Sequence, residues 1–478
     1  MTTIPSEDLI RRFDRNGPRY TSYPTADRFV EAFDAMSQGW WLMERATRSS
    51  GRPIAVYVHV PFCESVCYYC ACNKIATRDR SHGSRYVTAL KREIALYAER
   101  MTADNPICQL HLGGGTPTFL SDDEIGSLLD ALAGAFGFVD GAELSIEVDP
   151  RTVDTARLAR LRTAGFNRIS FGVQDVEPAV QQAVHRVQST DRVFELVDSA
   201  RALGFASINV DLIYGLPMQT AATFARTMQT IVRLRPDRIA VYAYAHLPER
   251  FKPQRRIDTA TLPAGAEKLA MLREAIATLG GAGYDYIGMD HFALPDDSLA
   301  VAHRRGSLQR NFMGYTTLPD CDLLGIGVSA IGAIGPTYAQ NHRELDHYLM
   351  ALENGELPIA RGIELTPDDL LRRAAIMGLM CGGELNFALL EDRFLVDPRI
   401  AFRRELAALD EHQRLGLVTI DRTGVRVTPA GQFFLRPIAM VFDRYIRRRA
   451  DEVEDATLPS GKAAGEKPTP APAFSRLI

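Results

Sequence analysis

Closely spaced thiols are the first residues of this chain that could do chemistry. Four of its seven cysteines fall within ten positions, directly after the apolar run IAVYVHV: Cys63, Cys67, Cys70 and Cys72. The first three have the spacing C-x-x-x-C-x-x-C, with which one loop can bind three irons of a four-iron cluster and leave the fourth open for a small molecule. Clustered thiols without an export signal favour metal or redox chemistry over disulfides. Cys72 is close enough in sequence to fill the open position.

A structural zinc site completed by Cys72 or His59 is the alternative. Zinc knuckles usually pair C-x-x-C with a second, distant pair of ligands, and the downstream sequence offers no obvious pair. The other three cysteines, Cys108, Cys321 and Cys381, are isolated in sequence, which is typical of ordinary buried thiols.

The elements that must position the cysteine loop form a regular series. From Ile54 onward, β-rich runs alternate with helical patterns, and the runs begin at IAVYVHV, CQLHL, ELSIEV, RISFGV, INVDLIYG, RIAVYAY and YDYIGMD. This alternation predicts parallel strands joined by helical crossovers, and nearly continuous apolar runs indicate burial on both faces. Six or seven such units predict an α/β fold with a full or partial barrel, of the (β/α)6 TIM-like type.

Polar or glycine-rich motifs follow nearly every predicted strand. In order they are the cysteine loop, GGGTPT (113–118), EVDP (147–150), GVQD (172–175), DLIYGLP (211–217), YAHLP (244–248) and MDHFA (289–293). Barrel enzymes build their active sites from the loops at the carboxyl ends of the strands. We therefore expect these motifs on one rim.

Taken singly, the rim motifs leave their roles open. GGGTPT lacks the Lys and Ser/Thr of a phosphate loop, so its glycines either form a tight turn or let a ligand approach the backbone. Glu147 and Asp211 either cap the next helix or face inward toward ribose hydroxyls or an ammonium group. Arg186 alone is typical of a solvated helical surface.

Composition and charge limit the class of protein and the partners that this chain can have. The 478 residues are 46% hydrophobic and 24% charged, with a formal net charge of −4, which argues against a global binder of polyanions. Neither a signal peptide nor a run of roughly 20 apolar residues is evident, so we expect a cytoplasmic protein without a membrane span. Five segments are predicted: an N-terminal arm (1–50), the barrel (51–295), a glycine-rich covering and substrate segment (296–362), a helical, winged-helix-like domain (363–449) and a disordered tail (450–478).

Many segments together resemble one known family. CESVCYYC followed by GGGTPT looks like the radical S-adenosylmethionine (SAM) enzymes. GPRYTSYPTA, YVHVPFC, CACNKI, HLGGGTPT, SIEVDP, GVQD, DLIYGLP, YAHLP, GMDHFA and DLLGIGVSAI resemble, in order, segments of oxygen-independent coproporphyrinogen III oxidase. The resemblance runs from about Gly17 to Tyr445.

The resemblance implies a set of site residues. Cys63, Cys67 and Cys70 would hold a [4Fe–4S] cluster whose open iron chelates one SAM, and Cys72 would be a non-ligand. That first SAM would be lined by Tyr57, Gly114, Glu147 and Ile331, and Tyr57 and Glu147 are also candidate catalytic residues. A second SAM would be lined by Tyr69, Gly115, Thr116, Gln174, Arg186, Asp211 and Ala245.

The resemblance also implies the reaction. A 5′-deoxyadenosyl radical would remove a hydrogen from the β-carbon of a propionate, and loss of carbon dioxide and one electron would leave a vinyl group. Two rounds would convert coproporphyrinogen III to protoporphyrinogen IX. A reduced flavodoxin- or ferredoxin-type donor would supply electrons, and a monomer is expected, with no nucleic acid or membrane partner.

Cationic residues are expected to meet the four substrate carboxylates. The candidates are Arg19 in the arm, Lys74 and Arg78 beside the cysteine loop, and Arg310; each could equally be a solvated surface residue. One departure from the family is Met313: this chain has RNFMGYT where RNFQGYT is common, so the polar amide of that position is absent.

Two rival functions remain open. The first is a heme chaperone that shares the barrel and the cysteine motif; the GPRYTSYPTA arm and the CACNKI continuation argue against it. The second is a DNA-binding regulator that uses the winged-helix-like domain. Its basic residues Arg372, Arg373, Arg403 and Arg404 are interspersed with acidic ones, which does not favour phosphate contacts.

Overall fold

The computed structural model describes residues 6–13, 16–48, 51–101, 105–318 and 321–446, so the predicted tail at 450–478 lies outside the described residues. The chain divides into two compact units. We call Phe29–Val301 with Thr317–Glu364 the sheet unit, and Met1–Arg28 with Ala302–Thr316 and Leu365–Ile478 the helical unit. These units divide the predicted arm and the predicted covering segment between them; the boundaries proposed from sequence stay predictions.

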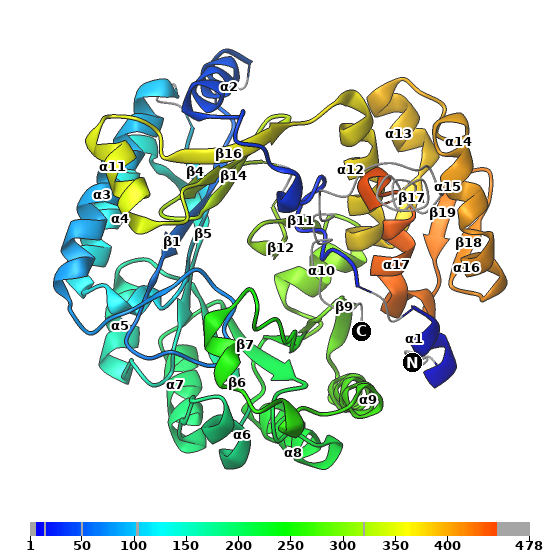
Figure 1. The fold of residues 1–478 in the computed structure, drawn as a ribbon, viewed down its shortest axis with the longest axis horizontal. Helices are drawn as coiled ribbons and strands as arrows, with labels where there is room; N and C mark the ends of the chain where they lie inside the picture. The colour runs from blue at the N-terminus through cyan, green and yellow to red at the C-terminus, as the bar shows by residue number, and fades with distance from the viewer. Residues whose placement is uncertain (1–5, 14–15, 49–50, 102–104, 319–320, 447–478) are drawn as a thin grey trace, which may run out of the picture. The chain divides into compact units, whose positions relative to one another are not determined.

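Six parallel strands form the centre of the sheet unit, as the sequence predicts (Figure 1). They are β1 (Ile54–Val60), β4 (Ile107–Gly114), β5 (Phe138–Val148), β6 (Arg168–Gln174), β7 (Ser207–Tyr214) and β8 (Arg238–Ala243). Each pairs with the next in that order, so the carboxyl ends of all six lie at one edge of the sheet. The predicted α/β class is confirmed.

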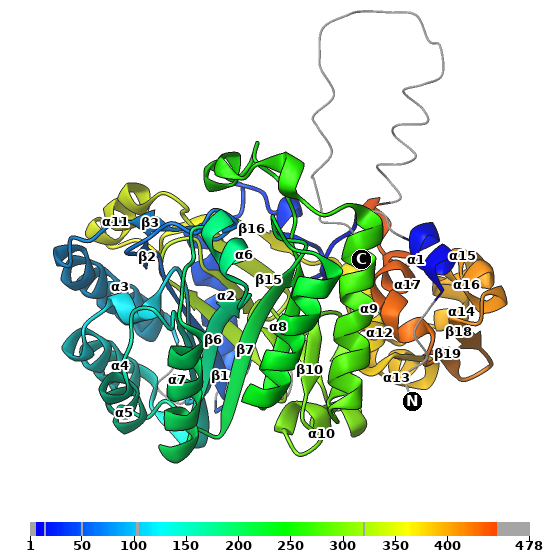
Figure 2. The same cartoon turned by 90° about the horizontal axis from the view of Figure 1, so that it is seen from below.

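Helices connect these strands and lie along the outer side of the sheet (Figures 1 and 2). They are α3 (Ser81–Arg100), α4 (Asp122–Phe136), α5 (Thr155–Thr163), α6 (Pro178–Ala183), α7 (Thr190–Ala202), α8 (Ala221–Leu234) and α9 (Gly265–Gly281). Local signals fix their starts. Ser121 and Glu124 form a capping box on α4, and Thr220 and Thr223 form one on α8.

The seventh predicted strand departs from the parallel series. β9 (Asp285–Gly288) pairs antiparallel with β10 (His291–Ala293), and β10 pairs antiparallel with β8. The reason is the short connection at Met289 and Asp290. Gly288 and Met289 have φ values of +135° and +53°, and this turn reverses the chain where a parallel partner would need a long crossover.

The glycine-rich segment after residue 320 continues the sheet on the other side of β1. β13 (Asp322–Ile326) is parallel to β1, and β14 (Ile331–Ile334), β15 (Thr337–Asn341) and β16 (Ile359–Glu364) follow it antiparallel. The strand order therefore has two ends, β16 and β9, and the sheet is open. The unit also contains α2 (Ala35–Arg48) and α11 (Leu345–Glu353). Whether this segment also covers the substrate stays a prediction.

The helical unit has a small sheet among its helices, as predicted for the C-terminal region. Its helices are α1 (Glu7–Phe13), α12 (Pro367–Gly382), α13 (Phe387–Phe394), α14 (Pro398–Ala401), α15 (Arg403–Ala408), α16 (Asp410–Arg414) and α17 (Leu435–Met440). Its strands are β11 (Gln309–Asn311), β12 (Gly314–Thr316), β17 (Glu384–Asn386), β18 (Val418–Ile420) and β19 (Gly424–Val427). β18 and β19 form a hairpin, and β17 pairs with β19.

The arm around GPRYTSYPTA is an integral part of the helical unit. Tyr20 and Tyr23 are buried, and the Tyr20 hydroxyl donates to Asp443 at 2.9 Å. The Arg436 guanidinium donates to the carbonyl of Gly17 at 2.5 Å. These contacts tie the first part of the chain to the last described helix. Among the described helices, none is both long and apolar enough to cross a membrane.

Candidate active site

The cysteine loop begins where β1 ends and is closed by backbone pairing. β2 (Phe62–Cys63) runs parallel to β3 (Ile75–Ala76), so both ends of the loop are held together. The loop is also fixed from the side, because Tyr68 N donates to Val184 O at 2.9 Å and the Tyr68 ring stacks on His185 at 5.1 Å. The connection between α6 and α7 thus positions the thiols.

A cavity opens beside this loop, and most of the predicted site residues line it. The lining residues are Cys63, Ser65, Cys67, Tyr69, Cys70, Cys72, Lys74, Gly114, Gly115, Thr116, Glu147, Val148, Asp149, Arg151, Ser170, Gly172, Gln174, Arg186 and Asp211. They come from the carboxyl ends of β1, β4, β5, β6 and β7 and from the connections that follow. The rim predicted from sequence is therefore present in the structure.

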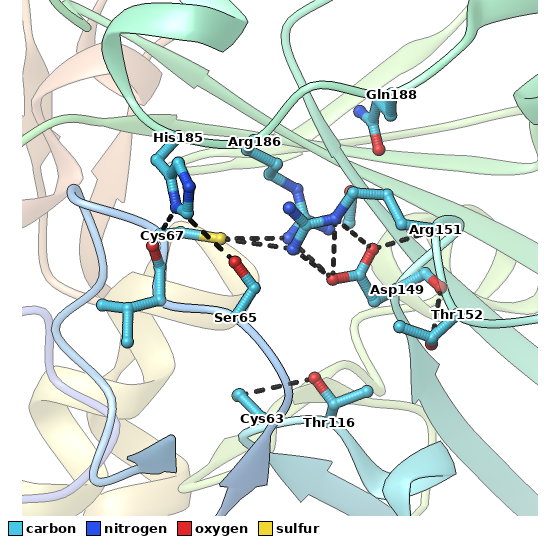
Figure 3. A network of polar contacts seen from close by, with 12 residues as sticks. Cys63, Ser65, Cys67, Thr116, Asp149, Arg151, Thr152, His185, Arg186 and Gln188 are labelled. Atoms are coloured by element: carbon cyan, nitrogen blue, oxygen red, sulfur yellow. Dashed lines mark hydrogen bonds and ion pairs between the residues drawn. The ribbon is translucent and has the colours of Figure 1, made fainter. Parts of the chain in front are cut away.

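Two guanidinium groups lie against the Cys67 thiol (Figure 3). Arg186 Nη1 donates to Cys67 Sγ at 3.3 Å, and Arg151 Nη2 donates to it at 3.5 Å. Asp149 holds both cations, with 3.1 Å to Arg186 Nη1 and 2.6 Å to Arg151 Nη2. Burial raises the pKa of Asp149, but the charges of these two arginines outweigh it and hold that pKa below its usual range.

The other thiols have different surroundings. The Thr116 hydroxyl donates to Cys63 Sγ at 3.5 Å, and burial raises the pKa of Cys63 to about 11. A hydrogen bond from Cys72, together with the charge of Lys74, lowers the pKa of Cys70 to about 5. The same hydrogen bond raises the pKa of Cys72.

Two carboxylates, those of Glu147 and Asp211, also line the cavity. Glu147 accepts from Gly114 N at 3.0 Å and from His111 Nε2 at 3.2 Å. Burial raises the pKa of Glu147, but these hydrogen bonds outweigh it and the net pKa is lowered. Burial and then the Glu147 charge raise the pKa of Asp211 to about 6. Asp211 is held by the Ser170 hydroxyl at 2.8 Å and can carry a proton near neutral pH.

The glycine turn is explained by its packing. Gly114 has a φ of +113°, and a Cβ there would lie 2.6 Å from His59 Cε1. A Cβ at Gly115 would lie 2.8 Å from Phe62 O. Both glycines are thus required by the close approach of the turn to the end of β1, and both also line the cavity.

Three predicted residues do not line this cavity. Tyr57 donates or accepts a hydrogen bond with His59 Nδ1 at 3.0 Å, and its ring stacks on His111 at 5.9 Å. Ile331 begins β14, and its backbone lies against Gly325, the β13 partner of Tyr57. Ala245 is linked to the cysteine loop because Gln254 Nε2 donates to both Ala245 O and Tyr69 O. Their cofactor contacts stay predictions.

The four substrate-binding candidates are placed differently. Lys74 lines the cavity and donates to the Cys70 carbonyl at 3.2 Å, whereas Arg78 is exposed. Arg19 and Arg310 belong to the helical unit. Met313 lies in the turn between β11 and β12, where its N–H donates to Asn311 Oδ1 at 2.8 Å.

The sequence named His59 only as a ligand of the alternative zinc site and assigned no role to several other residues that shape the site. His59 bonds to Tyr57, and His111 bonds to Glu147. Asp149 and Arg151 pair with each other beside the cysteine loop. Gln254 donates to the carbonyl of Tyr69 within that loop. Strand periodicity could have identified His59, because residues i and i+2 of a strand share a face and Tyr57 was already assigned. Asp149 and Arg151 directly follow β5, where rim residues are expected. Gln254, far from any strand end, gave no such signal.

The donor set fits a four-iron cluster. Three thiols at the predicted spacing surround one cavity and have half-buried or buried positions. Within the described residues, no three His, Cys, Asp or Glu side chains lie close enough together to hold a single metal ion. Thiols that bind separate irons of a cube need not converge on one point, so this arrangement suits a cluster.

Comparison with known proteins identifies the class of this fold and site. The sequence profile of the radical SAM superfamily matches residues 57–231, and that of the HemN C-terminal domain matches residues 365–434. The solved structure of coproporphyrinogen III oxidase (HemN) from Escherichia coli, described as a radical SAM enzyme, superposes with a TM-score of 0.88 at 45% sequence identity. The match covers 93% of this chain and 100% of that one. The fold is therefore that of a radical SAM protein.

Relatives narrow the class to one family. The chain is 47% identical to oxygen-independent coproporphyrinogen III oxidase of Pseudomonas aeruginosa, over 92% of this chain and 95% of the relative. It is 46% identical to that of Escherichia coli, over 92% and 96%. The chain belongs to the oxygen-independent coproporphyrinogen III oxidase family.

Proposed function

We propose that this protein converts two propionate side chains of coproporphyrinogen III to vinyl groups without oxygen, giving protoporphyrinogen IX. The observation that carries the proposal is 46–47% identity over 92% of the chain to two oxidases of that name. The cavity described above supports it, because three thiols and two carboxylates meet at one edge of the sheet.

Cys63, Cys67 and Cys70 are the residues that hold the [4Fe–4S] cluster. When bound, such a cluster supplies the single electron that cleaves SAM and starts carbon-radical chemistry. Cys72 is then a neighbour rather than a ligand, which leaves the fourth iron open for SAM. Tyr57, Gly114, Glu147 and Ile331 position the first SAM, and Glu147 remains ionised to meet a cationic or hydroxyl group.

A second SAM is placed among Tyr69, Gly115, Thr116, Gln174, Arg186, Asp211 and Ala245. Arg186 is 6% exposed, and its buried Nε has no hydrogen-bond partner within the described chain. A buried donor without a partner is costly, and a carboxylate ligand would satisfy it. This supports Arg186 as the residue that meets the methionyl carboxylate.

Arg310 is the substrate-binding candidate with the strongest support. Its guanidinium stacks on the Tyr315 ring at 4.5 Å, and its Nε and Nη1 are buried without a hydrogen-bond partner in the described part of the chain. The Tyr315 hydroxyl is itself fixed by the Met380 carbonyl at 3.1 Å. A substrate with four carboxylates can supply the missing acceptor. In the sheet unit, Lys74 lines the cavity and can meet an anionic group there. The effect of Met313 is tested by measuring turnover of Met313→Gln.

The proposal extends to the electron donor, the assembly and the location of the enzyme. The electron donor is a reduced flavodoxin- or ferredoxin-type protein, and the enzyme works as a cytoplasmic monomer. The experiment is anaerobic reconstitution with iron and sulfide, followed by turnover with SAM and coproporphyrinogen III. Formation of 5′-deoxyadenosine and protoporphyrinogen IX is expected. Retention of added heme with neither product would favour a heme chaperone instead.

A further inference from the structure

Cys67 differs from the other two predicted cluster ligands because two guanidinium groups donate to its sulfur. These are the groups of Arg186 and Arg151, at 3.3 Å and 3.5 Å (Figure 3). The Tyr69 hydroxyl also forms a hydrogen bond with this thiol. Burial raises the pKa of Tyr69, and the charge of Arg186 only partly offsets that rise. By contrast, Cys63 accepts from the neutral Thr116 hydroxyl at 3.5 Å.

Asp149 fixes Arg151 in this position. Arg151 Nε donates to Asp149 Oδ1 at 3.0 Å and Arg151 Nη2 to Oδ2 at 2.6 Å, which is the two-pronged geometry of a strong guanidinium–carboxylate pair. The Arg151 backbone N–H also donates to Asp149 Oδ1 at 3.0 Å. Asp149 is only 8% exposed, so this carboxylate cannot exchange its partners for water freely. The guanidinium is therefore preorganised toward the sulfur.

The two arginines play different parts. Arg186 keeps a buried Nε without a partner, which suits a ligand in the cavity. Arg151 instead directs its Nε and Nη2 donors to Asp149 and Cys67. Two cations and one carboxylate leave a net charge of +1 beside Cys67. A ligand bound by Arg186 would use the charge of that arginine, whereas the charge of Arg151 stays beside the sulfur.

From this geometry we propose that Arg151, held by Asp149, is a positioning residue that raises the reduction potential of the cluster through Cys67. The inference rests on the proposed function, since it requires a cluster at the three cysteines. The oxidised and reduced clusters differ by one electron, and that electron adds negative charge to the sulfurs. Hydrogen bonds to ligand sulfurs and nearby positive charge stabilise the reduced form more than the oxidised form.

The test is a redox titration of the reconstituted protein without SAM. Arg151→Met removes the charge and the donors while keeping a similar length, and Arg151→Lys restores the charge without the two-pronged geometry. The matched control is Arg226→Met. Arg226 makes a similar two-pronged pair with Glu177, at 2.9 Å and 2.8 Å, but does not line the cavity. The measured quantities are iron content and the fraction of reduced cluster, followed by electron paramagnetic resonance at fixed potentials.

Arg151→Met is expected to bind a full cluster whose reduced-to-oxidised ratio at a fixed potential falls at least tenfold, which corresponds to about 59 mV for one electron. Arg151→Lys should lie between this variant and the wild type, and Arg226→Met should match the wild type. An unchanged ratio in Arg151→Met with a full cluster would overturn the inference. Loss of the cluster in both Arg151 variants would also overturn it, in favour of a structural role. A wild-type protein that takes up no cluster would refute the proposed function itself.

Discussion

Arg151 and Arg310 show two ways in which this protein buries a guanidinium group. In the sheet unit, Arg151 is held by Asp149 and directed at Cys67, so its donors have acceptors within the protein. In the helical unit, Arg310 stacks on Tyr315 but leaves Nε and Nη1 without an acceptor among the described residues. The first arrangement is complete without substrate, whereas the second is not.

The difference separates stability from binding. Removing one member of a buried, balanced ion pair is costly, because it leaves the other charge uncompensated. Removing a buried charge that has no partner relieves a cost that folding already bears. Variants of Arg310 should therefore gain stability as they lose substrate. Arg151→Met leaves Asp149 paired with Arg186, so it should keep the fold and change the cluster instead.

The largest effect is expected from Cys67→Ser. A serine hydroxyl is not a thiolate, so the cluster should be lost and the formation of 5′-deoxyadenosine should fall to background. Iron content and the absorption of the reconstituted protein measure the loss. Cys381→Ser, a buried thiol of the helical unit outside the cavity, is the control and should keep its iron. A full cluster in Cys67→Ser would remove Cys67 from the ligand set.

Arg310→Met tests the other side of the comparison. Loss of a charge-assisted hydrogen bond, worth about 1.5–3 kcal/mol, should lower kcat/KM for coproporphyrinogen III by about 10–150-fold. The thermal midpoint should rise, because the buried unpaired charge is gone.

Arg393→Met is the matched control for this variant, since Arg393 also stacks on a ring, that of Phe394 at 5.5 Å, in the same unit. It should change neither quantity much. A normal KM in Arg310→Met would show that the substrate carboxylates are bound elsewhere.

A smaller effect, on the stability of the fold, is expected from Asp211→Asn. The Asp211 carboxylate is close enough to Glu147 for the two negative charges to repel each other. The folded-state pKa of Asp211 is raised from 3.8 to about 6, so the folded protein binds this proton more tightly than the unfolded chain does. Wild-type stability from this group is therefore present below pH 4 and is lost as the pH rises through 6. At pH 8, Asp211→Asn should be more stable than wild type by about 1–3 kcal/mol, and the difference should vanish near pH 4.

Urea unfolding of the cofactor-free protein across this pH range measures the difference. The Glu147 charge is the second cause of the raised pKa, after burial. In a Glu147→Gln background the effect of Asp211→Asn should therefore shrink. An equal difference at pH 4 and pH 8 would show that Asp211 does not titrate between them.

Sequence could predict those features that depend on local pattern. The six parallel strands are apolar runs of the right length, and the rim motifs follow them. These two patterns are enough to predict that Glu147, Asp211 and the thiols lie at one edge of the sheet. The reversal at β9 was missed because it depends on positive φ values at Gly288 and Met289. The partners of Arg151 and the lack of partners for Arg310 are properties of packing between distant segments, and no spacing in the sequence reports them.

The smallest effect is expected from Cys72→Ser. This variant compares Cys72 with Cys67, a thiol that has two cations beside it. Cys72, by contrast, is exposed and shares its proton with Cys70. A serine can keep that hydrogen bond, so the cluster should remain and iron content should be close to that of the wild type. The pKa of Cys70 depends first on the bond from Cys72, so Cys72→Ala should slow cluster assembly more than Cys72→Ser does. Reconstitution rates of the two variants, measured at one pH, test this order. A cluster lost from Cys72→Ser would instead make Cys72 a ligand and fill the iron position that SAM needs.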